Sequence, residues 1–249
     1  MGKKRTSLEN LLVIPPENLR RKAGGNSNHK KRSLTPTVNE ADRMRQIYYV
    51  AARLFCEKGY EATSMSDIAE AVGFTKAAIY HFIPGGKQDL LNDIISFGMN
   101  SLERQVIEPA QLIADPEERL RAIIANHVRI ITSGSESVGF NPVTVVVDEI
   151  AGLSVAQRRK ITLRKRVYVD LIRDTLRQLQ EQGHLKDIDI TVTAFSLLGM
   201  ILWLARWYRP NGKLTGDQVA NEITKLAMNG LLSVPKRSRK KVTKGAPPT

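Results

Sequence analysis

Residues 64–82 read SMSDIAEAVGFTKAAIYHF. Ser64 and Asp67 form a cap pair at the start of one short helix, and Thr75 caps a second one. Gly73 supplies a tight turn between them, because glycine adopts a positive φ angle without the steric cost that other residues meet. Two short helices joined in this way are typical of a helix-turn-helix, whose second helix presents its N-terminal residues to base edges in the major groove.

The same pattern also fits an ordinary helical hairpin with a glycine turn, so the flanking sequence has to separate the two interpretations. Apolar residues recur before the motif at helical spacing and predict one more helix. These residues are Ile47, Val50, Ala51, Leu54 and Phe55. The motif ends in Tyr80-His81-Phe82 and is followed shortly by Lys87. This ordered combination favours the helix-turn-helix.

Capping patterns predict where later helices begin. These starts are Asp115-Pro116, Ser154-Val155-Ala156-Gln157 and Thr215-Gly216-Asp217-Gln218. The helix after Ser154 continues to Gly183 and is unusually long. Residues 190–208 are apolar nearly all round, so we expect neighbours to enclose them on most sides. Residues 143–147 are β-branched and are taken as helix, which leaves no convincing strand. The sequence predicts an all-α fold.

Charge divides the 249-residue chain, which carries a net charge of +13. Residues 1–37 hold nine Lys or Arg against two acids, and residues 235–249 hold six and no acid, so the part between them is neutral. We expect two disordered basic segments, either solubility tails or arms that displace counterions from nucleic acid. Residues 38–88 are the expected DNA-binding domain, and residues 89–234 the expected effector-binding and dimerisation domain.

Several classes of protein are excluded by composition. A single cysteine, Cys56, excludes a disulfide scaffold and a cysteine-rich zinc site, and the four histidines are scattered. Gly85-Gly86-Lys87 lacks the rest of a phosphate-binding loop, so we expect no enzyme, metal or cofactor. The longest apolar run, 192–205, falls short of the roughly 20 residues that a membrane span needs. We therefore expect a cytoplasmic protein with no membrane partner.

Residues 52–91, ARLFCEKGYEATSMSDIAEAVGFTKAAIYHFIPGGKQDLL, resemble the TetR/AcrR family of bacterial transcriptional regulators. Residues 202–212, LWLARWYRPNG, look like the dimerisation helix of a subgroup that senses acyl-CoA thioesters, including regulators of steroid and fatty-acid catabolism. One residue more than usual separates the aromatic pair from Lys87, which puts the reach of this lysine to phosphate in doubt. The resemblance implies an N-terminal three-helix DNA-binding domain and a C-terminal helical domain for ligand binding and dimerisation.

The resemblance also implies which residues contact DNA. They are Ser64, Ser66, Thr75, Lys76, Ala77, Tyr80, His81 and Lys87. Lys76 is expected to donate to guanine O6 and N7, and Ala77 to touch a thymine methyl group. The serines, Tyr80, His81 and Lys87 are expected to contact the phosphate backbone. The alternatives are a solvated charge for Lys76 and packing beside Phe82 for His81.

Two copies of a helix-turn-helix are needed for affinity, so we expect a homodimer on a palindromic operator in double-stranded DNA. Residues 190–208 and 217–232 are the expected interface, a four-helix bundle with Trp203 and Trp207 as anchors. Alternatively, one of these tryptophans lines a pocket. By resemblance, the small-molecule effector binds among residues 89–208. The candidates, for each of which core packing is the alternative, are Met99, His127, Phe140, Tyr168 and Trp203.

The long helix after Ser154 also carries a run of cations, which are either a solvated face or a site for the phosphates of a CoA thioester. They are Arg158, Arg159, Lys160, Arg164, Lys165, Arg166 and Arg173. Together these features predict a bacterial transcriptional repressor, nucleoid-associated in the cytoplasm, that an acyl-CoA effector releases from DNA by population shift. The alternative is an architectural DNA-binding protein that responds to no ligand.

Overall fold

The computed structural model describes residues 40–133, 141 and 150–233. These residues are helical almost throughout, and within the described ranges only an isolated antiparallel bridge, between Leu185 and Leu232, has β geometry. The all-α fold is therefore confirmed. Phe140, residues 143–147 and both basic segments lie outside the described residues.

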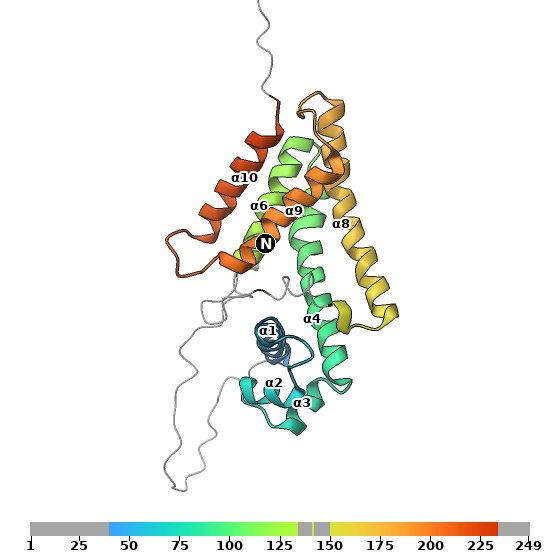
Figure 1. The fold of residues 1–249 in the computed structure, drawn as a ribbon, viewed down its shortest axis with the longest axis vertical. Helices are drawn as coiled ribbons and strands as arrows, with labels where there is room; N and C mark the ends of the chain where they lie inside the picture. Colours follow the sequence, from blue (N-terminus) through green and yellow to red (C-terminus); the bar gives the residue numbers. More distant parts are fainter. Residues whose placement is uncertain (1–39, 134–140, 142–149, 234–249) are drawn as a thin grey trace, which may run out of the picture.

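Three helices form a small head at one end of the molecule (Figure 1). They are α1 (Glu40–Lys58), α2 (Met65–Val72) and α3 (Lys76–Phe82). The predicted helix-turn-helix is present: Gly73 ends α2 with φ +79°, and the Phe74 amide donates to the carbonyl oxygen of Ala69 over 2.8 Å. A side chain at this φ would be strained, so the turn between α2 and α3 requires glycine.

Each head helix contributes completely buried side chains to one small core. Ile47 and Phe55 of α1, Ile68 of α2 and Ile79 of α3 all have no exposed surface. The predicted apolar face of α1 is therefore confirmed. Burying each of these side chains contributes about 1.5–3 kcal/mol, so the angle between α2 and α3 is fixed by packing as well as by the turn.

The helix α4 (Gly86–Leu102) carries the chain from the head into the larger body (Figure 1). It continues without a break into a π-helical turn, η3 (Glu103–Ile107), and then into α5 (Glu108–Gln111). The boundary expected between residues 88 and 89 falls in the first turn of α4, and the division into domains stays a prediction.

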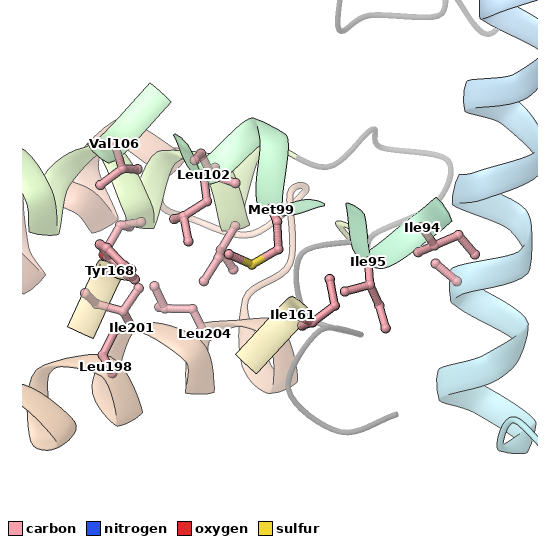
Figure 2. Close-up of a cluster of buried hydrophobic side chains, with 14 of the residues drawn as sticks. Ile94, Ile95, Met99, Leu102, Val106, Ile161, Tyr168, Leu198, Ile201 and Leu204 are labelled. Carbon is pink, nitrogen blue, oxygen red and sulfur yellow. The ribbon is translucent and has the colours of Figure 1, made fainter. Parts of the chain in front are cut away.

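The body is built around α6 (Pro116–Thr132), which packs against all three of the later long helices. These are α8 (Val155–Glu181), α9 (Ile190–Trp207) and α10 (Gly216–Leu231). A short 3-10 turn, η5 (Ile150–Gly152), precedes α8. Buried side chains of α4, η3, α8 and α9 form a continuous apolar cluster in this body (Figure 2).

The predicted helix starts in the body are confirmed. The Asp115 side chain accepts from the amide of Glu118, and Pro116 is in the first turn of α6. Ser154 and Thr215 each form a capping box at the first turn of α8 and α10. These caps satisfy amides that the helices themselves leave unpaired.

The expected enclosure of α9 is not found within one chain. Only 28 % of α9 is buried, and its mean hydropathy is 1.5 over 18 residues, so by length and composition alone it meets the minimum for a membrane span. Trp203 is 64 % exposed and Trp207 50 % exposed, and Val192 and Phe195 lie open as well. A single chain covers α9 mainly with α6 and α8, which leaves the remaining apolar surface without a neighbour among the described residues.

Candidate nucleic-acid interface and effector core

The N-terminal end of α3 presents an open surface at the tip of the head. Thr75, Lys76 and Ala77 are exposed there, and Tyr80 and His81 are exposed one turn further along. The Thr75 hydroxyl accepts from the amide of Ala78 over 3.1 Å, which fixes where α3 begins. Ile79 is buried in the core on the opposite face of α3. The five side chains therefore lie on one side of α3, and none of the described residues covers that side.

Two serines lie at the start of α2. The Ser64 hydroxyl accepts from the amide of Asp67 over 3.1 Å and donates to Asp67 Oδ2 over 2.8 Å, so it already closes the cap. The backbone amide and the hydroxyl of Ser64 both donate to this carboxylate and lower the pKa of Asp67. Ser66 is exposed in the first turn. Both positions face solvent beside the positive end of a helix dipole.

Lys87 lies against the head itself. Its Nζ donates to the carbonyl oxygens of Tyr60 at 2.9 Å and of Glu61 at 3.3 Å, and it lies 4.4 Å from the centre of the Tyr60 ring. The His81 ring meets the edge of Phe82 with centroids 5.8 Å apart, although His81 remains exposed. The expected phosphate contacts of Lys87 and His81 stay predictions.

Sequence reasoning missed the contact between the head and η5. Gln88 Nε2 donates to the carbonyl oxygen of Gly152 over 3.2 Å. A Cβ atom on Gly152 would lie 2.6 Å from the Tyr60 ring and 2.8 Å from a Leu91 methyl group, so only glycine permits this approach. No local pattern gives this contact, because Gln88 and Gly152 are 64 residues apart.

A polar pair lies in the apolar core of the body. His127 of α6 and Tyr168 of α8 are buried, with His127 Nδ1 2.9 Å from the Tyr168 hydroxyl oxygen. Burial lowers the pKa of His127 to about 4 and raises the pKa of Tyr168. The imidazole is therefore neutral at physiological pH.

Three of the five effector candidates belong to this core. Met99 is buried in the same apolar cluster as Tyr168, the hydrogen-bond partner of His127, and Figure 2 shows it with Tyr168, Leu198 and Ile201. Trp203 lies on the outer surface of α9 instead. Phe140 is outside the described residues.

An open groove of about 380 Å³ lies between α6 and α10, on the side of α6 that faces away from His127. It is lined by Arg121, Ala122, Ala125, Asn221, Thr224, Lys225 and Asn229. None of the candidate effector residues lines it.

The cation run of α8 is only partly neutralised by neighbouring acids. Arg164 pairs with Glu103 at 2.8 Å and also donates to the side-chain oxygen of Asn100. Arg166 and Arg173 share Asp170, at 3.7 and 3.4 Å. Nearest the start of α8, three cations are exposed, and no ion pair joins them to any residue that the structure describes. They are Arg158, Arg159 and Lys160.

Two family models match the chain. The model for bacterial regulatory proteins of the tetR family matches residues 47–94, and the model for the tetracyclin repressor-like C-terminal domain matches residues 114–231. A curated relative, the HTH-type transcriptional repressor KstR2 of Rhodococcus jostii (strain RHA1), is 28 % identical over 207 residues. That alignment covers 79 % of this chain and 95 % of the relative.

Solved structures agree with these matches. The structure of AibR in complex with isovaleryl coenzyme A and operator DNA is 41 % identical and covers 74 % of this chain and 97 % of AibR, with a TM-score of 0.64. The TetR family transcriptional regulator PfmR from Thermus thermophilus is 34 % identical with the same two coverages and a TM-score of 0.62.

Proposed function

The chain belongs to the TetR family of bacterial regulatory proteins, whose members are DNA-binding regulators and not enzymes, and we propose how this member works. It is a ligand-responsive repressor that binds a palindromic operator as a homodimer in the cytoplasm and leaves it when an acyl-CoA thioester binds. The proposal is carried by one observation: the same chain has an exposed N-terminal end of α3 in its head and a buried polar pair, His127 and Tyr168, in its body.

The DNA contacts follow from the exposed side of α3. Lys76 reaches guanine O6 and N7, and Ala77 touches a thymine methyl group beside it. Thr75 faces the groove beside them, and Tyr80 and His81 position the head on the backbone together with Ser64 and Ser66. Lys87 is the least supported of these contacts, because its ammonium already bonds to Tyr60 and Glu61.

The dimer buries the apolar surface that one chain leaves open. Trp203 and Trp207 are four residues apart and therefore lie on one face of α9, and Leu226 of α10 is exposed as well. Packing α9 and α10 against their copies forms a four-helix bundle. In this assembly the second subunit, and not a membrane, covers the exposed apolar face of α9.

The effector enters the core of the body. AibR has been solved with isovaleryl coenzyme A, and in this chain the acyl group lies near Met99, His127 and Tyr168, with Phe140 as a further candidate. Trp203 is supported better as an interface residue, because it lies outside the core. Arg158 and Lys160 are about 12–15 Å along α8 from Tyr168, and their charges suit the phosphates of a CoA group.

Release of DNA is a population shift in this proposal. The effector favours a conformer whose two heads are mis-spaced for successive major grooves, and it can shift the equilibrium only by its differential affinity for the two conformers. The AibR structure holds effector and operator together, so the quantity to measure is the change in operator affinity and not all-or-none exclusion.

Two measurements on the full chain test the proposal. Footprinting on the DNA upstream of its own gene locates an operator, and the operator affinity is then titrated with a series of acyl-CoA thioesters. A palindromic footprint, weakened at least fivefold by one thioester, supports the proposal. A footprint without sequence preference that no thioester changes supports an architectural DNA-binding protein instead, for which the net charge of +13 is the favouring observation.

A further inference from the structure

A buried side chain in the body has a polar atom without a hydrogen-bond partner among the described residues. This atom is His127 Nε2. Three other side-chain atoms in the described residues share this lack of a partner, on Arg53, Arg173 and Thr224, but those residues are only partly buried. Native proteins leave few buried polar atoms unpaired, so such an atom calls for a functional reason.

The hydrogen bond to Tyr168 assigns the proton on this imidazole. A phenol carries one O–H donor, and the only acceptor that the described residues offer to Tyr168 is His127 Nδ1, at 2.9 Å. If Nδ1 carried the proton, the Tyr168 proton would be buried without an acceptor, which is costly. Tyr168 therefore donates to Nδ1. The proton of the neutral ring is on Nε2, so the unpaired atom is a donor.

The surroundings limit what can accept from this donor. The buried threonines of the body, Thr132, Thr175 and Thr193, are not hydrogen-bonded to this atom, and each donates instead to a backbone carbonyl oxygen of its own helix or cap. Around Tyr168, the partner of His127, the labelled side chains of the cluster are apolar, among them Met99, Leu198 and Ile201 (Figure 2). A carboxylate buried among them would need a positive charge, whereas a carbonyl oxygen needs only a donor.

The side of the body that faces α6 also contains the π-helical turn η3, where Val106 and Ile107 are buried. A π-helical turn inside an α-helix is rare and frequently occurs at functional sites. Met99, one helical turn before η3, has an unbranched side chain that adapts readily to a new neighbour. An acyl chain that enters this core would do so by repacking around Met99.

We propose that His127 Nε2–H is the donor that recognises the thioester carbonyl oxygen of the effector, and that Tyr168 is a positioning residue that fixes the required tautomer. This inference rests on the proposed function, because it assigns a role inside the same effector core. It adds a selectivity: the protein distinguishes a thioester from the free acid and from an analogue without the carbonyl group.

The test compares isovaleryl-CoA and octanoyl-CoA with their thioether analogues, in which a CH2 group replaces the carbonyl group, by calorimetry on the full chain. The wild type should bind the better thioester at least tenfold more tightly than its thioether. His127→Phe should reduce this ratio to less than twofold, and His127→Gln, which retains an N–H donor, should keep part of it. Thr175→Val removes another buried hydroxyl from α8 and is the matched control that should leave the ratio unchanged.

A second measurement reports the tautomer without any ligand. The imidazole nitrogen chemical shifts of the free protein should show Nε2 protonated in His127, and Tyr168→Phe should shift the population toward the Nδ1 tautomer. A wild-type ratio near one, a ratio that survives in His127→Phe, or an Nδ1 proton in the free protein overturns the inference. If neither thioester binds the wild type, the proposed acyl-CoA effector fails, and this inference fails with it.

Discussion

The Nζ atom of Lys87 lies 2.9 Å from the carbonyl oxygen of Tyr60, so the first turn of α4 is tied to the turn between α1 and α2. Tyr60 in turn lies against Gly152 of η5, next to Leu91. The head, α4 and η5 therefore meet at one tyrosine.

Replacing Lys87 with methionine should lower the free energy of unfolding by about 1–2 kcal/mol, because two carbonyl oxygens lose a charged donor. Urea unfolding followed by circular dichroism measures this change. Lys213→Met, at an exposed position, is the control and should be neutral. Equal stabilities for the two variants would contradict the structural role. If Lys87 also contacts phosphate, its loss reduces the slope of log K against log salt concentration for operator binding by about 0.9, the value for one phosphate contact.

Removing residues 1–37 should flatten the salt dependence of operator binding. Residues 38–84 hold five Lys or Arg against six acids, so the head alone is a weak electrostatic DNA binder, whereas the deleted segment carries nine cations. The measured quantity is the slope of log K against log salt concentration, which falls by about 0.9 for each lost phosphate contact.

The matched control for that deletion removes residues 235–249, which carry six cations. The last described helix, α10, ends at the opposite end of the molecule from α3 (Figure 1), so this truncation should change the slope less. An unchanged slope after the N-terminal deletion would refute a role for that segment in DNA binding.

Introducing a charge into the exposed face of α9 should separate the dimer. Trp203→Lys together with Trp207→Lys places two cations where two large apolar side chains are expected to meet their copies. Sedimentation velocity should show a dimer for the wild type and a monomer for the double variant. Leu163→Lys, at an exposed apolar position of α8, should remain dimeric, and a dimeric double variant would rule out this interface.

The buried imidazole should make stability depend on pH. The pKa of His127 is lowered to about 4 on folding, against about 6.5 in the unfolded chain. Between these values the unfolded chain binds more protons, so the free energy of unfolding falls as the pH drops through this window and the contribution is complete only above 6.5.

The full difference between the two pKa values corresponds to roughly 3 kcal/mol. Between pH 7 and pH 4.5 the free energy of unfolding, measured with urea, should therefore fall further in the wild type than in His127→Gln. The exposed His184 provides the control, and His184→Gln should keep the wild-type pH dependence. Identical pH profiles for wild type and His127→Gln would show that the histidine is not buried in its neutral form.

The parts of the fold that the sequence predicts are those with local causes. The caps at Ser64, Thr75 and Ser154 and the turn at Gly73 depend on residues within a few positions of one another, and all four are confirmed. The length of α8 follows from its apolar period and its capping box in the same way.

The rest depends on contacts between distant positions, which no local pattern contains. Lys87 and Tyr60 are 27 residues apart, and His127 and Tyr168 are 41 residues apart. Both members of the second pair were candidates for the effector core, but their hydrogen bond and the unpaired Nε2 atom become visible only when α6 and α8 pack together. For Trp203 the sequence shows the apolar character of the side chain but not its exposure. That exposure follows from the packing of α9, one face of which no described helix covers.

We expect residues 75–80 to form a rigid probe that a pair of subunits inserts into the major groove. Fluorescence anisotropy on the operator and on a scrambled duplex of equal length measures it most directly, with Lys76→Ala and Tyr80→Phe combined in one full-length variant. Because a good base contact contributes about 1–3 kcal/mol of discrimination, the preference for the operator should fall about tenfold or more while the circular dichroism spectrum stays the same. A folded variant that still selects the operator as well as the wild type does would contradict the account.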